Sequence, residues 1–250
     1  MSITIKSHRE IELMRHAGKL LGKTLEQLEK AVKPGMSTWE LNKIGDDIIK
    51  GYDCIPSFLN YNGYPASICI SVNDEVVHGI PKKEVILQEG DIVSIDAGLI
   101  YQGYHADAAR TVPVGEISEN AEKLIQVTKQ SFFEGIKYAK QGNHLFEISK
   151  AIGAYAESFG YGVVRSLIGH GIGSRLHEDP QIPNFKQRRR GPKIESGMTF
   201  AIEPMINEGT WRVYWLDDDW TVCTEDGLLS AHYENTVLIT DGEPEILTLL

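Results

Sequence analysis

The sequence predicts an α+β fold in which two related halves pack around a pseudo-twofold axis. Amphipathic helical patterns are followed by short β-type runs, and the order helix, helix, strands occurs twice. Residues also recur at a constant offset of 107 positions, so that Gly35 matches Gly142 and Gly90–Asp96 matches Gly197–Glu203. Because each repeat ends in an acidic residue, this arrangement would bring acidic side chains together at its centre.

Length and composition suit a globular protein. The chain has 250 residues, 42% hydrophobic and 24% charged, and we expect one domain whose halves cover about 1–115 and 116–250. A net charge of −10 argues against a surface built as a whole for nucleic acid. The chain shows no basic and apolar leader, no apolar run long enough for a membrane, and three widely spaced cysteines. We therefore expect a cytoplasmic protein with reduced thiols, acting as a monomer.

Helical periodicity predicts four helices. Ser7–Glu10 has the spacing of a capping box, and the apolar residues that follow recur at helical intervals until Pro34. The other three helices are expected from Ser37 or Thr38 to about Gly51, from Glu119 to Lys140, and from Leu145 to Phe159. Strands are expected in the β-type runs Ser67–Val72, Ile92–Ile95, Thr199–Glu203 and Thr236–Thr240.

Residues 92–98 and 105–112 predict a β-hairpin. A turn centred between Tyr101 and Gln102 would place Asp96 directly opposite Asp107, with Cα atoms about 4.5 to 5.5 Å apart. Two carboxylates held together on one face are costly unless a proton or a cation lies between them. The alternative is a solvent-facing pair on the outer side of the hairpin.

Three further residues suit the same chemistry. Glu203 and Glu234 adjoin apolar strands, and a buried ionised carboxylate needs a partner, for which arginine or lysine would serve as well as a metal. His170 lies between glycines, where the backbone can approach a neighbour closely, although a histidine there is more often an ordinary loop residue. Two divalent cations would balance the charges of four carboxylates, as in two-metal hydrolase sites.

At this point a family resemblance is clear over essentially the whole chain. The sequence resembles the type I methionine aminopeptidases, in the bacterial form without an amino-terminal zinc-binding extension. The resemblance is carried by the motifs Tyr64–Asn73, His78–Pro81, Ile95–Gly98, Gly103–Asp107, Gly169–Gly173, His177-Glu178, Phe200–Pro204 and Tyr233–Thr236.

The resemblance implies a pita-bread fold and a site for two divalent metal ions per subunit, with Co, Mn or Fe as the metal and Zn or Ni as substitutes in vitro. The implied metal ligands are Asp96, Asp107, His170, Glu203 and Glu234. His78 and His177 would contact the substrate, and Glu203 would also move a proton. Bound divalent ions bring the pKa of water toward neutrality, which supplies a nucleophile without a catalytic serine or cysteine.

The implied activity is removal of the amino-terminal methionine from nascent proteins, favoured when the second residue is small. The residues that match the methionine pocket are Phe58, Tyr61, Tyr64, Cys69, Leu176 and Trp220. Phe58 stands where many relatives carry cysteine, and Leu176 where an aromatic residue is usual. For each aromatic residue, core packing is the ordinary alternative.

Other readings of the sequence stay open. A prolidase or an aminopeptidase P would share the five ligands but usually carries a large additional amino-terminal domain, and a non-catalytic binding module of the same fold would have lost ligands. The basic run Lys186–Arg190 is either a solvated loop or, through Arg188, Arg189 and Arg190, a contact with ribosomal RNA.

Overall fold

A computed structural model describes residues 3–250 of the chain. All four helices begin where the sequence predicts, and the capping box of the first helix is formed: Ser7 Oγ accepts from the Glu10 amide, while the Glu10 carboxylate accepts from the Ser7 amide. Within residues 3–250, no helix has both the length and the apolarity needed to cross a membrane. The helices are α1 (His8–Ala31), α2 (Thr38–Gly51), α3 (Glu119–Ile136) and α4 (Leu145–Glu157).

The predicted ends of the two later helices are wrong by a few residues. After α3 the backbone tightens, because the amide of Tyr138 donates to Gly135 and that of Ala139 donates to Ile136, each only three residues back. Beyond α4 the chain turns at Gly160, whose φ of 84° lies outside the helical range. Both turns follow from local backbone geometry that helical periodicity does not reveal.

The strands form four small sheets, and every pairing in the described residues is antiparallel. One half carries β1 (Ile55–Pro56), β2 (Ile68–Val72), β4 (Ile92–Tyr101) and β5 (Tyr104–Pro113) in one sheet, and β3 (Glu75–Val77) in another. The other half carries β6 (Gly162–Val163), β7 (Gly169–Gly171), β8 (Glu178–Ile182), β9 (Thr199–Ile202), β10 (Met205–Asn207), β11 (Val213–Trp215), β12 (Val222–Thr224), β13 (Ser230–His232), β14 (Asn235–Leu238) and β15 (Glu245–Ile246).

The β4–β5 hairpin forms, but its predicted register is wrong by two residues. The turn is centred between Gln102 and Gly103, whose φ values of 46° and 85° suit a two-residue type I′ turn. Asp96 therefore pairs with Ala109, and Asp107 pairs with Gly98. A shift of two residues leaves both aspartates on the same face of the sheet, because side chains alternate with a period of two.

The sequence repeat recurs in backbone hydrogen bonds. The amide of Gly35 donates to Leu87 O at 2.8 Å, and at the same offset of 107 the amide of Gly142 donates to Ile194 O at 2.9 Å. Two isolated antiparallel bridges are related in the same way, Ser37 with Ile86 and His144 with Lys193. On these recurrent bonds we propose that residues 1–115 and 116–250 are related halves of one domain.

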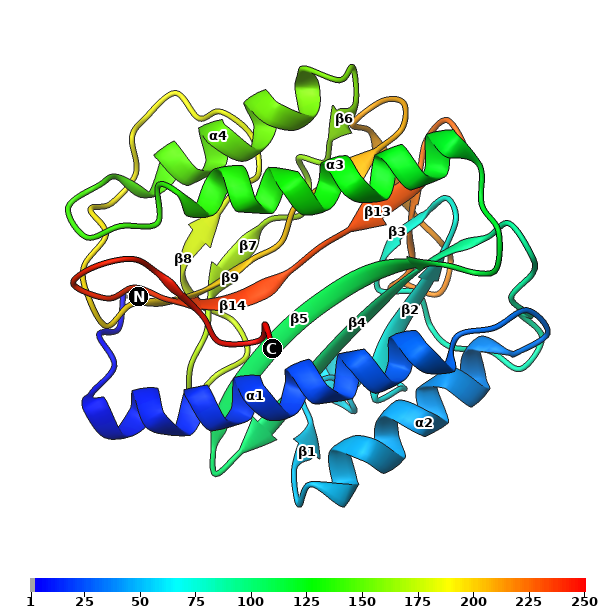
Figure 1. Cartoon of the computed structure of the whole chain (residues 1–250), viewed down its shortest axis with the longest axis horizontal. Helices are drawn as coiled ribbons and strands as arrows, with labels where there is room; N and C mark the ends of the chain where they lie inside the picture. Colours follow the sequence, from blue (N-terminus) through cyan, green and yellow to red (C-terminus); the bar gives the residue numbers. More distant parts are fainter. Residues whose placement is uncertain (1–2) are drawn as a thin grey trace.

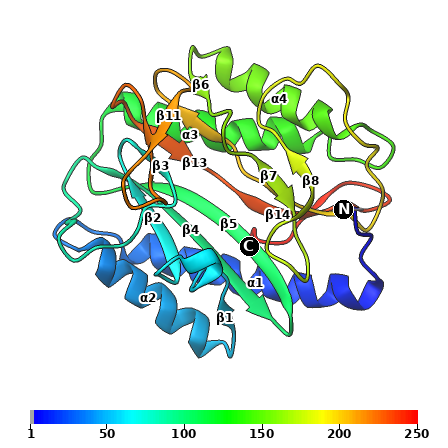
Figure 2. The same cartoon turned by 180° about the vertical axis from the view of Figure 1, so that it is seen from behind.

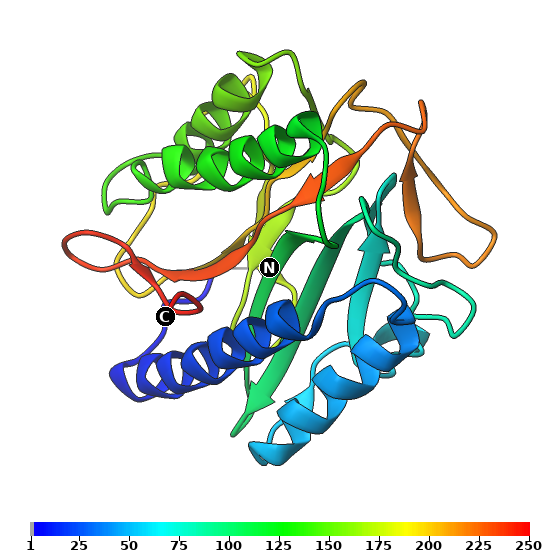
Figure 3. The same ribbon diagram turned by 45° about the vertical axis from the view of Figure 1, so that its right-hand side comes forward.

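The two halves meet at their sheets. Figure 1 shows α1 and α2 together on one side of the strands and α3 and α4 together on the other, and the turned view in Figure 3 shows the same separation. From behind, β5 and β14 run between the two helix pairs (Figure 2). The Thr236 hydroxyl accepts from the amide of Asp107 at 2.9 Å and donates to its carbonyl at 2.8 Å, and Ala109 and Glu234 exchange backbone bonds. Segments from both halves are thus joined beside the acidic residues.

Candidate active site

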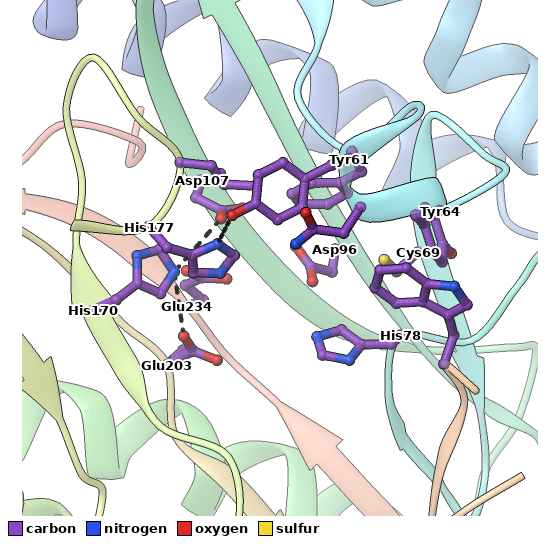
Figure 4. A pocket seen from close by; sticks show the side chains of 14 residues that line it. Tyr61, Tyr64, Cys69, His78, Asp96, Asp107, His170, His177, Glu203 and Glu234 are labelled. Carbon is purple, nitrogen blue, oxygen red and sulfur yellow. Dashed lines mark hydrogen bonds and ion pairs between the residues drawn. The ribbon is translucent and has the colours of Figure 1, made fainter.

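A cavity of about 270 Å³ opens at the junction of the two halves. Every site residue proposed from the sequence lines it, together with Asn62. Figure 4 shows the acidic side chains and His170, His177 and His78 gathered in it. Its acidic side is lined by Asp96, Asp107, Glu203 and Glu234 with the three histidines His78, His170 and His177, and its apolar side by Phe58, Tyr61, Tyr64, Cys69, Leu176 and Trp220.

The four acidic residues reach the cavity from different strands. Asp96 lies on β4 and Asp107 on β5, whereas Glu203 directly follows β9 and Glu234 lies between β13 and β14. Asp96 is 9% exposed and Asp107 5%, so the alternative of a solvent-facing pair is wrong. In the described part of the chain, none of the four forms an ion pair with arginine or lysine.

Burial and mutual repulsion disfavour the ionised forms of these acids. Burial raises the pKa of Asp96 to about 7. The pKa of Asp107 is raised well above its ordinary value by burial and then by the charges of Asp96 and Glu203, and burial likewise raises the pKa values of Glu203 and Glu234. At neutral pH the cluster therefore needs either protons or cations.

His170 faces this cluster as a lone-pair donor. Its Nδ1 lies 2.8 Å from Gly171 O, and because a carbonyl only accepts, Nδ1 carries the proton. Burial lowers the pKa of His170 to about 3, so the ring is neutral and Nε2 is unprotonated. This Nε2 lies 3.6 Å from Glu203 Oε1 and 4.0 Å from Asp107 Oδ2. A backbone carbonyl that orients the far nitrogen is the usual arrangement of a metal-binding histidine.

The donor set fits divalent cations. Ligand atoms of Asp107, His170 and Glu234 lie within 4.8 Å of one another, and all three residues are buried. Asp96 Oδ1, Asp107 Oδ1 and Glu234 Oε1 are buried without a hydrogen-bond partner in the described structure. Unpartnered buried oxygens are costly, and hard divalent ions prefer such oxygen donors.

The other two histidines of the cavity lie at its edge. His177 packs on His170 with ring centroids 4.2 Å apart, and its Nδ1 is 2.6 Å from the hydroxyl of Tyr61 (Figure 4). His78 follows β3 in a left-handed conformation with φ of 60°, which turns it toward Trp220 at a centroid distance of 6.3 Å. Burial lowers the pKa of His78 to about 4, so its ring is neutral near pH 7.

The apolar side of the cavity is a continuous cluster. Tyr64 meets Trp220 edge to face at a centroid distance of 5.1 Å, and its hydroxyl donates to Gly79 O. Phe58, Cys69 and Leu176 are buried in the same cluster. The two positions that depart from the family pattern, Phe58 and Leu176, therefore belong to the cavity wall.

Two polar residues near the site were missed by the sequence reasoning. His232 is buried, neither ring nitrogen has a hydrogen-bond partner within residues 3–250, and Nε2 lies 3.9 Å from both Glu203 Oε2 and Glu234 Oε2. His105 Nδ1 lies 2.9 Å from Ser57 Oγ. Each histidine stands two positions before an acidic residue, a spacing typical of side chains on one face of a strand, and this signal could have identified both.

Comparison with known proteins agrees with this geometry. A model of Metallopeptidase family M24 matches residues 12–241. The chain belongs to this family. The methionine aminopeptidase of Clostridium acetobutylicum is 58% identical over 247 residues, which cover 99% of both chains. The crystal structure of methionine aminopeptidase from Thermotoga maritima is similar with a TM-score of 0.97 at 45% identity and covers 100% of both chains.

Family membership confirms the expected pita-bread fold and identifies the chain as a metal-dependent hydrolase. The resemblance to the short bacterial methionine aminopeptidases is likewise confirmed. Xaa-Pro dipeptidase from Bacillus anthracis shares the fold with a TM-score of 0.78, at 22% identity over 98% of this chain and 61% of that one. The match thus leaves a substantial part of the dipeptidase outside the aligned region.

Proposed function

We propose that this chain removes the amino-terminal methionine of polypeptides by metal-assisted hydrolysis of the first peptide bond. The observation that carries the proposal is a single cavity in which buried, unpaired carboxylates face an apolar aromatic wall. The first feature suits hydrolytic metal ions and the second suits a methionine side chain, whose flexible thioether packs well against aromatic faces. The names of the relatives support the same activity.

Two divalent ions are proposed as the resident metals. Four carboxylates carry four negative charges when ionised, so two such ions would neutralise them. Oxygen donors with one imidazole accept Co, Mn or Fe, and also Zn or Ni in vitro. When bound, such ions supply a water of lowered pKa and polarise the substrate carbonyl. The ligands would be Asp96, Asp107, His170, Glu203 and Glu234.

Three side chains are proposed to assist the reaction. Glu203, which lines the cavity beside the other carboxylates, would accept a proton from the attacking water and deliver it to the departing amine. His177, at the edge of the cavity, would donate to the carbonyl oxygen as negative charge develops there. His78, neutral and next to Trp220, would contact the scissile amide.

The methionine side chain is proposed to occupy the apolar wall, in contact with Phe58, Tyr61, Tyr64, Cys69, Leu176 and Trp220. The preference for a small second residue is an expectation from the family resemblance. A series of Met-Gly, Met-Ala, Met-Val and Met-Leu peptides would test it, with kcat/KM expected to fall along the series.

One assay distinguishes the proposed activity from its alternatives. Release of methionine from a Met-Gly peptide is expected with added Mn²⁺, Fe²⁺ or Co²⁺ and is expected to stop with chelator. Cleavage confined to X-Pro bonds such as Met-Pro would instead indicate a prolidase-type enzyme. No release with any of these metals would favour a binding module and would contradict the proposal.

We propose that the substrates are nascent chains. We also propose that the enzyme is a monomer and acts in the cytoplasm. The thiols of Cys54, Cys69 and Cys223 are free and buried, which suits a reducing compartment. Arg188, Arg189 and Arg190 are exposed, and we propose that they contact ribosomal RNA through its phosphates. Replacing all three with glutamine should weaken co-sedimentation with ribosomes at low salt; unchanged co-sedimentation would refute the contact.

A further inference from the structure

His177 is held by one well-defined side-chain contact. The hydroxyl of Tyr61 lies 2.6 Å from Nδ1 of His177, and the two rings are tilted at a centroid distance of 5.3 Å (Figure 4). The other ring nitrogen, Nε2, has no hydrogen bond to any residue within 3–250, and the ring lines the cavity. Tyr61 therefore occupies the far side of His177 and leaves Nε2 for a ligand.

Tyr61 is placed by a tight turn. Asn60 and Asn62 have φ values of 65° and 49°, a left-handed conformation that asparagine tolerates better than most residues. The amide of Tyr61 donates to Phe58 O at 2.9 Å, and the amide of Asn60 donates to Tyr64 O at 2.8 Å. The hydroxyl is thus presented by a closed turn (η1, Tyr61–Gly63).

The segment that carries His177 is fixed from the opposite side. Glu178 Oε2 accepts from Lys6 Nζ at 2.7 Å and from Thr4 Oγ1 at 2.7 Å, and the Lys6–Glu178 ion pair is buried. Glu178 Oε1 accepts from the amide of Arg175 at 3.2 Å. Since both Tyr61 and the neighbour of His177 are anchored, the contact between the two rings is built into the fold.

The contact favours one tautomer of the imidazole. An imidazole with its ordinary pKa of about 6.5 is mostly neutral at pH 8, and burial raises the pKa of Tyr61, which keeps the phenol protonated. A phenol can donate or accept, but it is a stronger donor than acceptor, so the contact favours donation from the Tyr61 hydroxyl to an unprotonated Nδ1, with the ring proton on Nε2. With the opposite tautomer, Nε2 would present a lone pair to the cavity and could not donate.

We propose that Tyr61 is a positioning residue whose hydroxyl holds His177 in the tautomer protonated at Nε2, so that this histidine can donate to the substrate carbonyl. The catalytic consequence of this inference rests on the proposed function. The tautomer itself is a property of the protein without substrate and can be measured independently. This role of Tyr61 differs from its role in the wall of the methionine pocket. Packing against the methionine side chain requires only the aromatic ring, whereas holding His177 requires the hydroxyl.

Tyr61→Phe removes the hydroxyl and keeps the ring. ¹⁵N NMR of histidine side chains distinguishes protonated from unprotonated ring nitrogens, and the full-length chain loaded with diamagnetic Zn²⁺ is a suitable sample. His177→Ala assigns the signal. We expect Nε2–H alone in the wild type and a mixture of tautomers in Tyr61→Phe. With Mn²⁺, kcat of Tyr61→Phe for a Met-Gly peptide should fall about tenfold, and KM should change less than about twofold. Complete loss of an oriented hydrogen-bond donor lowers kcat by about 10² to 10³, and a mixture of tautomers loses the donor only in part.

Tyr104→Phe is the matched control. It removes a hydroxyl that binds Glu10, outside the cavity, and should change neither the His177 spectrum nor the kinetics. A wild-type His177 protonated at Nδ1, or a Tyr61→Phe variant with an unchanged tautomer and kcat, would overturn the proposal. So would an increase in KM alone, which would leave Tyr61 as a pocket wall. If no peptide is cleaved with any metal, the proposed function fails, while the spectra still decide the tautomer.

Discussion

Replacing Asp96 with asparagine should stabilise the metal-free protein, although the same change should impair metal binding. Burial raises the pKa of Asp96 from 3.8 to about 7. Because the pKa is higher in the folded chain than in the unfolded chain, deprotonation of this group opposes folding. The penalty is absent below about pH 4, grows as the pH rises from about 4 to 7, and then stays constant.

The size of the effect follows from the difference in pKa. At about 1.4 kcal/mol per pKa unit, a rise from 3.8 to about 7 corresponds to roughly 4 kcal/mol of unfolding free energy at pH 8. In EDTA, Asp96→Asn should therefore be more stable than the wild type by up to about 4 kcal/mol at pH 8 and nearly equal at pH 4. The nearby acids also lose a repulsive neighbour, which acts in the same direction.

Urea unfolding followed by circular dichroism at pH 4, 6 and 8 would measure this difference. Asp47→Asn, at an exposed position of α2, is the control and should leave stability unchanged at each pH. Added Mn²⁺ should stabilise the wild type more than Asp96→Asn. If Asp96→Asn is less stable than the wild type at pH 8 without metal, or if the difference does not vary with pH, then the buried charge of Asp96 does not oppose folding.

Three further predictions follow from other contacts. Glu178→Gln should lower the unfolding free energy by about 3 kcal/mol, because it leaves the buried Lys6 charge unpaired. Replacing both Lys6 and Glu178 with methionine should recover most of this loss, and urea unfolding of both variants would measure it. Trp220→Ala should raise KM for Met-peptides more than it lowers kcat, and unchanged kinetics would remove Trp220 from the pocket. His177→Ala should lower kcat by about 10² with KM little changed, and a loss confined to KM would argue against donation to the carbonyl.

Local features of the fold were predictable from the sequence because local interactions determine them. The capping box predicted at Ser7 forms through short-range hydrogen bonds with Glu10, and a second box, not predicted, forms between Ser37 and Glu40. The β4–β5 hairpin was predicted, but its register was not, because Gln102 adopts a left-handed conformation that its residue type does not signal. A two-residue error left Asp96 and Asp107 on the correct face, so the consequence for the site was small.

Long-range features required either the family resemblance or the structure. Charge alone could not tell whether Glu203 and Glu234 would meet a metal, an arginine or solvent, since burial of an acid admits several partners. The spacing of His232 from Glu234 is typical of side chains on one face of a strand, but the 3.9 Å approach of His232 Nε2 to Glu203 Oε2 joins separate strands and is visible only in the fold. The Lys6–Glu178 pair joins residues 172 positions apart, and no local pattern marks either partner.

Anomalous diffraction from crystals equilibrated with Mn²⁺ would show whether the five proposed ligands hold a pair of metal ions. We expect two manganese peaks about 3.5 to 4 Å apart, enclosed by Asp96, Asp107, His170, Glu203 and Glu234. A correctly folded crystal in which manganese binds elsewhere, or in which these five side chains contact no metal at saturating Mn²⁺, would contradict this expectation.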